Sequence, residues 1–386
     1  MQKNPESRVP GISPLAEAII DLEAIRHNVR QFRAAVPDKQ ILAVVKADGF
    51  GHGVSQVAQA CLDAGATWLG VATPREAIEL REAGFLSPIL SWLPLLPFAS
   101  ENDYRLLVEQ EIDLSVIHID ELDRLALAAA ESGKTARVHL KIDTGIHRSG
   151  CDLSNWPALC EHAAALERSG ALKVIGIWSH LYHGLEADCG LGNQEQSERL
   201  VAALGVAREH GLAPEQVHLA NSAGTIRLPE LGFTMVRVGA GIYGIYREDV
   251  NLRYAMTLRS KISALHQINI GEGVGYDHVW QASRPTRLGL VPLGFADGIP
   301  RDIQGAEMLV SDAEGNSFRV PLVGRVSMDQ CVVDLTDTTA ELGAEVLVFG
   351  EGTRGEPTAD DWAIWANTNQ HDIFCGVGKR VQRTYR

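Results

Sequence analysis

The feature that most constrains this chain is a regular alternation of short apolar segments and helix-like segments between residues 41 and 238. Eight apolar segments have the length and composition of buried strands and lie at 41–45, 67–71, 88–92, 113–117, 137–142, 173–178, 216–220 and 235–238. Segments with helical apolar spacing lie between most of them, at 54–64, 74–83, 120–131, 154–167 and 194–210. This alternation predicts an α/β fold, a (β/α)8 TIM barrel.

A doubly wound open sheet is the alternative architecture for this pattern. It is disfavoured because no GxGxxG motif follows the first strands. Ahead of the repeating units, residues 1–14 are polar with three prolines and predict a loose N-terminal arm. A short strand at 18–21 and a helix at 22–36 follow this arm. We therefore expect the barrel to span residues 15–248.

The pattern changes from about Arg247 onward. Short alternating segments rich in β-branched residues are separated by Gly, Asp and Asn turns, at 258–270, 286–292, 318–323 and 330–335. One helix is expected at 358–366, with a capping start at Thr358. Residues 249–386 are therefore expected to form a second, mostly antiparallel β domain.

Length and charge narrow the class of protein. A chain of 386 residues with 45% hydrophobic content is expected to fold into more than one domain. Its formal charge of −14 argues against binding to nucleic acid or to anionic membranes. No apolar run approaches the length of a membrane span, and the N-terminal segment lacks the hydrophobic core of a signal peptide. We expect a cytoplasmic protein.

The six cysteines are scattered without CxxC spacing, which argues against a zinc ribbon and against a disulfide framework. One group of potential metal ligands comprises His180, His183, Asp188 and Cys189. Its spacing is too irregular for a metal site, and a loop after a strand is the simpler interpretation. We expect no metal.

Lys46 follows the apolar segment 41–45 in the sequence ILAVVKADGFGHG. In a (β/α)8 barrel, active sites lie at the C-terminal ends of the strands, so this lysine is placed to meet a ligand. Partial burial lowers the pKa of an amine and makes it a Schiff-base nucleophile. The alternative is an ordinary, solvated lysine at a strand end.

Polar residues also follow the later strands. Lys141 and Arg148 follow the fifth strand, His180 the sixth, and Arg237 lies on the eighth. The loops after strands seven and eight are the usual phosphate site of this architecture, which predicts a phosphate between Ser222 and Gly239. A lysine, a phosphate site and a polar group for a ring nitrogen are the requirements of pyridoxal 5′-phosphate (PLP).

At this point the chain resembles the alanine racemase family along nearly its whole length. The motifs that carry the resemblance are AVVKADGFGHG, KIDTGIHRSG, WSHL, ANSAG, VRVGAGIYG, VGYDHVW, PLGFADGIPR, VGRVSMDQCVVDLT and DIFCGVGKRVQRTYR. The resemblance implies a PLP-dependent amino-acid racemase, an isomerase that interconverts L- and D-alanine. It also implies a barrel followed by a β domain, and a homodimer with shared active sites.

The family's residue roles carry over motif by motif. Lys46 resembles the PLP lysine and the base on one face of the substrate. Tyr276 resembles the opposite base, contributed by the partner subunit, and His180 resembles the partner of that tyrosine. A racemase needs both bases, because a proton removed from one face of Cα must be replaced from the other.

The remaining roles concern substrate and cofactor. Arg148 resembles the residue that orients the substrate carboxylate, and Lys141 the lysine that is often carbamylated to hold that arginine. Met328 resembles a substrate-carboxylate contact from the other subunit. The residues implied in cofactor binding, besides Lys46, are Ser222, Arg237, Gly239, Ala240 and His371. Arg237 would face the pyridine nitrogen and, because guanidinium keeps its protons, would leave that nitrogen unprotonated.

The chain departs from the family pattern at several positions. Tyrosine is usual at Phe50 and at His371, asparagine at Asp48, glycine at Asp277, and aromatic residues at Phe295 and Ile299. The changes at Phe295, Ile299 and His371 are expected to bear on the substrate pocket or its entrance. They leave two alternatives open: a racemase for serine or another larger or polar amino acid, and a non-catalytic PLP-binding homologue.

Overall fold

The computed structural model describes residues 13–182, 189–229, 233–246 and 250–386. The expected N-terminal arm, residues 1–14, therefore lies almost entirely outside the described residues. The chain divides into two compact units: Leu22–Arg253 forms one, and Met1–Asp21 together with Tyr254–Arg386 forms the other. Within the described ranges, no helix is both long and apolar enough to cross a membrane.

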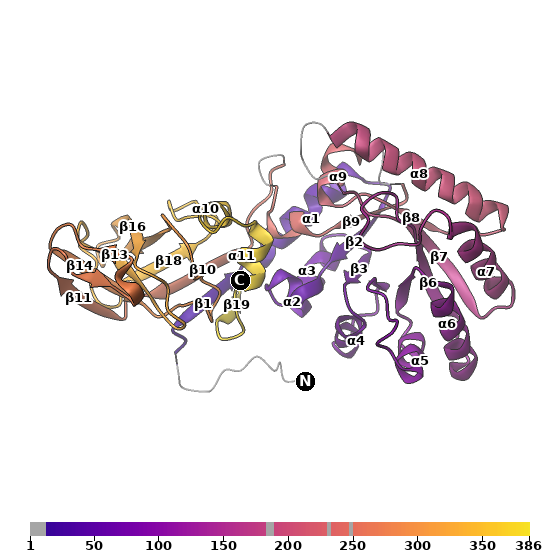
Figure 1. Ribbon diagram of the computed structural model, residues 1–386, viewed down its shortest axis with the longest axis horizontal. Helices are drawn as coiled ribbons and strands as arrows, with labels where there is room; N and C mark the ends of the chain where they lie inside the picture. Colours follow the sequence, from indigo (N-terminus) through magenta and orange to yellow (C-terminus); the bar gives the residue numbers. More distant parts are fainter. Residues whose placement is uncertain (1–12, 183–188, 230–232, 247–249) are drawn as a thin grey trace. The chain divides into compact units, whose positions relative to one another are not determined.

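The first unit contains the predicted closed barrel of parallel strands (Figure 1). In the described part of the chain its strands are β2 (Gln40–Val44), β3 (Trp68–Val71), β4 (Ile89–Ser91), β5 (Asp113–Val116), β6 (Ala136–Lys141), β7 (Leu172–Trp178), β8 (Gln216–His218) and β9 (Met235–Val238). The ring closes where β2 pairs in parallel with β9, with Ile41 opposite Val236. Strands β3, β4, β5 and β9 are buried at every residue, which explains why they read as continuous runs rather than as alternating patterns.

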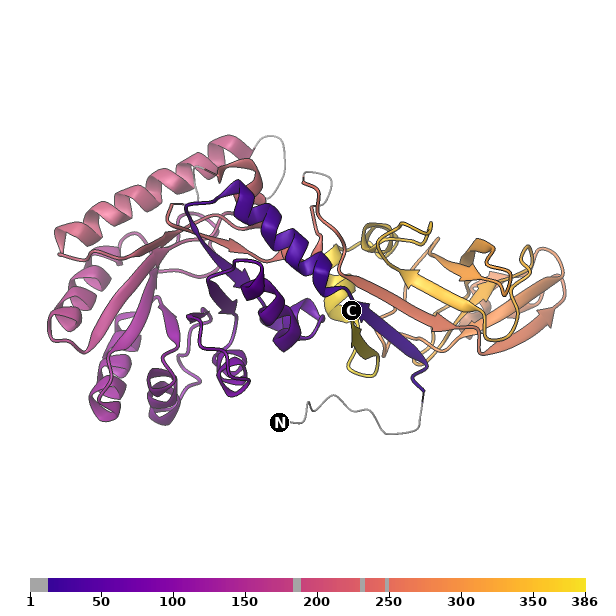
Figure 2. The ribbon, with the colours of Figure 1, turned by 180° about the vertical axis from the view of Figure 1, so that it is seen from behind.

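Helices surround the barrel strands in both views (Figure 1, Figure 2). They are α1 (Leu22–Ala35), α3 (Val54–Asp63), α4 (Pro74–Glu82), α5 (Glu101–Glu109), α6 (Ile119–Ser132), α7 (Trp156–Arg168), α8 (Cys189–Glu209) and α9 (Ser222–Arg227). The sequence analysis did not predict α5. Its start carries a reciprocal capping box between Ser100 and Asp103, a signal that was present in the sequence.

The second unit is built on a mostly antiparallel sheet, as predicted. In the described residues its strand order is β11-β14-β17-β16-β15-β18-β10-β1-β19. The strands are β1 (Ala16–Ile20), β10 (Met256–Lys261), β11 (Ala264–Ile268), β14 (Thr286–Val291), β15 (Glu307–Ser311), β16 (Ser317–Val323), β17 (Cys331–Asp334), β18 (Glu345–Phe349) and β19 (Gln382–Tyr385). Helix α10 (Ala359–Trp365) begins at the predicted cap, Thr358, and α11 (Gln370–Gly376) follows it.

Strand β1 lies in this second unit, which differs from the expected barrel start at residue 15. It pairs antiparallel with β10 and parallel with β19, and Figure 2 shows the indigo strand among the orange and yellow strands of the unit. Its residues alternate between buried and half-exposed. That alternation suits a sheet with two different faces, whereas barrel strands β3, β4, β5 and β9 are buried throughout. Residues 16–20 thus belong to the same sheet as residues 382–385 near the C-terminus.

Candidate active site

Lys46 lies at the C-terminal mouth of the barrel, where it begins the short element α2 (Lys46–Phe50) after strand β2. From Ala47 to Phe50 the backbone is left-handed, with φ between +53° and +60°. This conformation costs about 1–2 kcal/mol per non-glycine residue, so surrounding contacts must hold it. The turn places Lys46 Nζ 5.9 Å from the ring centre of Phe50 and 5.8 Å from that of Trp92. The lysine is therefore half-buried beside two aromatic rings.

Glu76 is the side chain that fixes this turn. One of its carboxylate oxygens accepts a hydrogen bond from Ala47 N at 2.6 Å, and the other accepts from Ala72 N at 3.0 Å and Thr73 N at 2.9 Å. A single carboxylate thus ties the turn after β2 to the loop after β3, through charge-assisted hydrogen bonds. The sequence analysis missed Glu76, although the Thr73-x-x-Glu76 spacing is a capping-box signal.

Ser222 and Gly239 come together at the ends of β8 and β9. The Ser222 hydroxyl oxygen accepts hydrogen bonds from Gly239 N at 2.9 Å and from Gly241 N at 3.2 Å. Gly241 must be glycine, because a Cβ there would lie 2.3 Å from a ring carbon of Phe32. Ala240 lies buried between the two glycines, at the start of η2 (Ala240–Tyr243). Two backbone amides and a hydroxyl therefore converge where the sequence predicts a phosphate.

Phe50 stands next to this group of donors. Its ring is stacked on Tyr243, with ring centres 4.5 Å apart, and the Tyr243 hydroxyl donates to Val44 O at 3.1 Å. A Cβ added to Gly239 would lie 3.7 Å from the tip of the Phe50 ring. Phe50 therefore presents only ring carbons to this group.

Arg237 is buried beneath the barrel mouth, with 4% of its surface exposed. Its guanidinium contacts two histidines, with 3.0 Å to His218 Nδ1 and 3.0 Å to His180 Nδ1. It also donates to Ser179 O at 2.9 Å and Leu219 O at 3.1 Å. Burial lowers the pKa of Arg237 to about 9, so it remains a cation at neutral pH. The arginine that the sequence singles out is thus held rigidly from several sides.

Burial and the neighbouring Arg237 together determine the protonation state of His180. Burial first, and then the positive charge of Arg237, lower the pKa of His180 well below its usual value. The ring is neutral, and because Arg237 donates to its Nδ1, its proton lies on Nε2. The charges of Arg148, Lys141 and Lys46 lower the same pKa, so these predicted site residues lie near one another.

Lys141 and Arg237 share a neighbour that the sequence analysis did not identify. The Lys141 amine lies 4.6 Å from the centre of the Trp178 ring, and the Arg237 guanidinium lies 4.7 Å from it. Burial first, and then Arg237 and Arg148, lower the pKa of Lys141 to about 8. About a tenth of the Lys141 amine is therefore uncharged at pH 7, compared with well under a hundredth at the usual lysine pKa.

Tyr276 lies in the second unit, within η3 (Tyr276–His278) and between the short strands β12 (Gly273–Val274) and β13 (Trp280–Gln281). It is 62% exposed. The next residue, Asp277, has φ +59°, a conformation that favours glycine, and its carboxylate forms an ion pair with Arg325. The tyrosine is therefore displayed outward on a turn that an ion pair restrains.

The other predicted residues of this unit differ in their exposure. Met328 is 55% exposed, and its carbonyl accepts a hydrogen bond from Ala296 N at 3.0 Å. His371 is half-buried on α11, whereas Ile299 is only 2% exposed. Phe295 N donates to Ser327 O at 3.0 Å, so Phe295 and Met328 lie on loops that are bonded to each other.

The barrel residues fit PLP by the chemistry of their donor groups. The cofactor requires an amine for its aldehyde, donors for its phosphate and a polar group for its ring nitrogen. Lys46, the group around Ser222, and Arg237 provide these at the ends of β2, β8 and β9 of one barrel. No cluster of three or more His, Cys, Asp or Glu residues able to hold a metal occurs in the described ranges, while His183 and Asp188 lie outside them.

Family models match both parts of the chain: the alanine racemase N-terminal domain matches residues 20–247, and the alanine racemase C-terminal domain matches residues 255–385. Relatives in curated collections agree. The chain is 44% identical to an alanine racemase of Frankia casuarinae, with 95% of each chain covered. It is 40% identical to an alanine racemase of Mycobacterium tuberculosis, over 99% of this chain and 98% of the relative.

Solved structures give the same result. Alanine racemase from D-cycloserine-producing Streptomyces lavendulae superimposes with a TM-score of 0.90 at 40% identity, covering 97% of this chain and 98% of that one. Alanine racemase from Bacillus anthracis, solved with bound L-Ala-P, gives a TM-score of 0.87 at 29% identity, covering 97% and 96%. The chain therefore belongs to the alanine racemase family, a family of PLP-dependent isomerases.

Proposed function

We propose that this chain interconverts L- and D-alanine with PLP, using Lys46 and Tyr276 as bases on opposite faces of the substrate. The observation that carries the proposal is the convergence of Lys46, Arg237 and the Ser222 donor group at the mouth of one barrel. When bound, PLP withdraws electrons from the substrate's Cα and so acidifies its α-proton. The remaining chemistry belongs to the side chains.

Lys46 accepts or returns a proton at Nζ on the barrel side of the substrate. Its turn is held by Glu76, so the amine is positioned before substrate arrives. Arg237 would hold the ring nitrogen of bound PLP by a hydrogen bond from its guanidinium. A guanidinium in this position leaves that nitrogen as an acceptor, which limits electron withdrawal and disfavours side reactions.

Tyr276 accepts or returns the proton on the opposite face. Its phenol starts with a pKa near ~10, so a donor that stabilises the phenolate is required. His180 carries its proton on Nε2 because Arg237 occupies Nδ1, and its lowered pKa keeps the ring neutral as the solution is acidified toward pH ~6.5. We propose that this Nε2–H is the donor and that Tyr276 comes from a second subunit of a homodimer. The cytoplasmic location stays a prediction.

Arg148 and Met328 are proposed to contact the substrate carboxylate. The lowered pKa of Lys141 raises the fraction of uncharged amine, which is the form that reacts with carbon dioxide. We therefore propose that carbamylated Lys141 restrains Arg148. His371 replaces a phosphate-contacting tyrosine in the resemblance, and it is the residue that favours serine or another larger, polar substrate as the alternative.

The first experiment tests the cofactor. Reconstitution with PLP is expected to produce an absorbance near the visible edge, and borohydride reduction should attach a pyridoxyl group to Lys46, located by peptide mass analysis. Lys46→Arg should lose this attachment, whereas Lys39→Arg should keep it, because Lys39 Nζ is bonded to Phe233 O. Absence of the band from the unmodified protein would contradict the proposal.

The second experiment tests the substrate and the two bases. Single enantiomers of alanine, serine and larger amino acids are compared as substrates, with alanine expected to be fastest. Tyr276→Phe is expected to lose exchange of the α-proton with solvent from one enantiomer of alanine more than from the other. Equal loss from both would contradict the two-base assignment, and cofactor binding without exchange from any amino acid would favour a non-catalytic homologue.

A further inference from the structure

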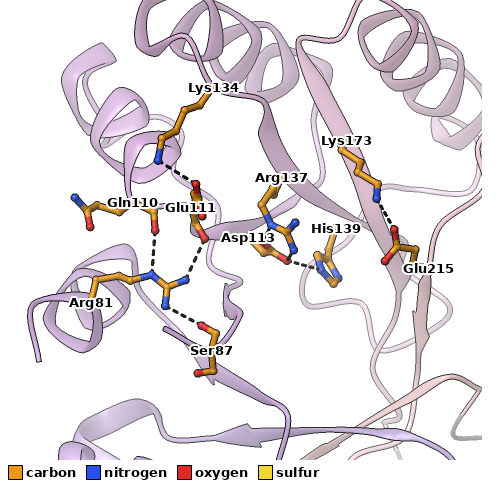
Figure 3. A network of polar contacts seen from close by, with 10 residues as sticks. All are labelled: Arg81, Ser87, Gln110, Glu111, Asp113, Lys134, Arg137, His139, Lys173 and Glu215. Carbon is orange, nitrogen blue, oxygen red and sulfur yellow. Dashed lines mark hydrogen bonds and ion pairs between the residues drawn. The ribbon is translucent and has the colours of Figure 1, made fainter. Parts of the chain in front are cut away.

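A continuous line of hydrogen bonds leads from Arg237 through the barrel interior to the other end of the barrel. His218 Nδ1 lies 3.0 Å from the Arg237 guanidinium, and His218 Nε2 lies 2.9 Å from His139 Nδ1. His139 Nε2 then lies 3.3 Å from the Asp113 carboxylate, which Arg137 also contacts through two nitrogens. Figure 3 shows Asp113 between Arg137 and His139.

The middle of this line is closed to solvent. Asp113, His139 and His218 each have 0% exposed surface. They lie on three strands: Asp113 begins β5, His139 is within β6 and His218 ends β8. The side chain of Arg137 is 33% exposed, so the line ends near solvent. A buried polar group without a hydrogen-bond partner destabilises the fold. Here each ring nitrogen of His139 and His218 has a hydrogen-bond partner.

Arg237 and Asp113, at the two ends of this line, determine which ring nitrogen of each histidine carries a proton. Arginine only donates, so His218 Nδ1 accepts, and the proton of neutral His218 is on Nε2. That Nε2–H donates to His139 Nδ1, which places the proton of His139 on Nε2, directed at the Asp113 carboxylate. Neutral His218 agrees with its pKa, which burial first and Arg237 next lower well below the usual value. Both imidazoles are thus neutral Nε2–H tautomers.

We propose that Asp113 is a positioning residue for Arg237, acting through the fixed tautomers of His139 and His218. The carboxylate selects the tautomer of His139, His139 selects that of His218, and His218 then offers Arg237 an acceptor rather than a donor. This acceptor restrains the guanidinium, which would hold the ring nitrogen of bound PLP. The role toward PLP rests on the function proposed above, whereas the tautomer selection does not.

The test uses Asp113→Asn. With Arg137 present, the amide oxygen turns toward the guanidinium and the amide NH2 toward His139, which reverses both tautomers and sets a His218 N–H against Arg237. We expect 15N NMR of the cofactor-free protein to report Nε2–H for both histidines in the unmodified chain and Nδ1–H in the variant. We also expect PLP binding to weaken by roughly tenfold to a hundredfold.

Two companion variants separate tautomer selection from general damage. Asp113→Asn combined with Arg137→Met frees the amide oxygen to accept from His139, so Nε2–H signals and PLP affinity should return. Glu215→Gln removes a carboxylate that pairs with Lys173 in the same region and should change neither readout (Figure 3). Unchanged tautomers in folded Asp113→Asn would overturn the proposal, whatever the cofactor proves to be.

If Asp113→Asn fails to fold, substitutions of His139 carry the test. His139→Gln keeps an acceptor for His218 and a donor for Asp113, so the Nε2–H signal of His218 should persist. His139→Leu removes the acceptor, so the Nε2–H form of His218 is then held by Arg237 alone, and we expect a lower Nε2–H population and weaker PLP binding. The same His218 population and the same PLP affinity in both variants would overturn the proposal.

Discussion

The two units hold their candidate residues in opposite ways. Arg237 of the barrel is 4% exposed and hydrogen-bonded from several sides, while Tyr276 and Met328 of the second unit are 62% and 55% exposed. The barrel residues are positioned by their own chain, as cofactor binding requires. The β-unit residues are presented outward. This is the division expected if the second half of each site serves another subunit.

Subunit complementation tests whether the barrel of one subunit and the β unit of another form one active site. It has the largest expected effect. Lys46→Ala and Tyr276→Phe should each lose nearly all racemase activity. In a mixed dimer with shared sites, one site carries both changes and the other carries neither. Refolding the two variants together should therefore restore about a quarter of the unmodified activity.

The control for complementation is a mixture of Lys46→Ala with the double variant Lys46→Ala/Tyr276→Phe, which contains no intact site in any pairing. It should stay inactive. No recovery in the first mixture would mean that both bases act within one chain.

Glu76→Gln tests whether the barrel's own contacts position Lys46 for cofactor binding. Losing one of two acceptor oxygens should lower the free energy of unfolding by about 1–3 kcal/mol and weaken PLP binding, because the turn that carries Lys46 is released. The control is Glu121→Gln, since Glu121 also bridges two backbone amides, Leu95 N and Ile117 N. Denaturant unfolding and PLP titration should show both variants destabilised, with only Glu76→Gln losing affinity. Equal loss of affinity would contradict this role.

Asp277→Gly tests whether the ion pair with Arg325 positions Tyr276 in the second unit. An ion pair between partly exposed groups contributes about 0–1 kcal/mol, so the rate of the step at Tyr276 should fall by up to about fivefold. The loss should be larger for α-proton exchange from one enantiomer than from the other. Asp337→Asn breaks the Arg284–Asp337 pair of the same unit and should leave exchange unchanged. A symmetric loss in Asp277→Gly would argue that the turn does not position the tyrosine.

Phe50→Tyr has the smallest expected effect. A hydroxyl next to the Ser222 donor group should contribute about 0.5–1.5 kcal/mol, which tightens PLP binding by up to about tenfold. Phe295→Tyr, in the other unit, should leave PLP affinity as it is. Titration of the apoprotein measures both, and a change confined to Phe295→Tyr would reverse the assignment of the cofactor to the barrel half.

The barrel was predictable because buried parallel strands are continuous apolar runs, which a sequence displays directly. In the second unit, β15 and β18 were missed because three successive residues of β15 and four of β18 are buried, so they lack the alternation expected of an antiparallel strand. Strand β19 was missed because its sequence, QRTY, is mostly polar. The fold was therefore predicted best where composition alone marks an element.

The site was predicted only where a motif marked it. Lys46, His180 and Arg237 stand in motifs, and the structure places them near one another. Asp113 and His139 do not, because no motif of the sequence contains them. Their relation to Arg237 depends on how β5, β6 and β8 align, which local sequence does not encode.

The position of β1 bears on how such a chain can be divided and recombined. The polypeptide passes between the units twice, at Asp21–Leu22 and at Arg253–Tyr254. A fragment beginning near residue 250 would lack β1, the strand to which β19 is paired. Exchange of the second unit with that of a relative by a single crossover would therefore join strands from two parents in one sheet, and the β1–β10 and β1–β19 contacts would have to suit both.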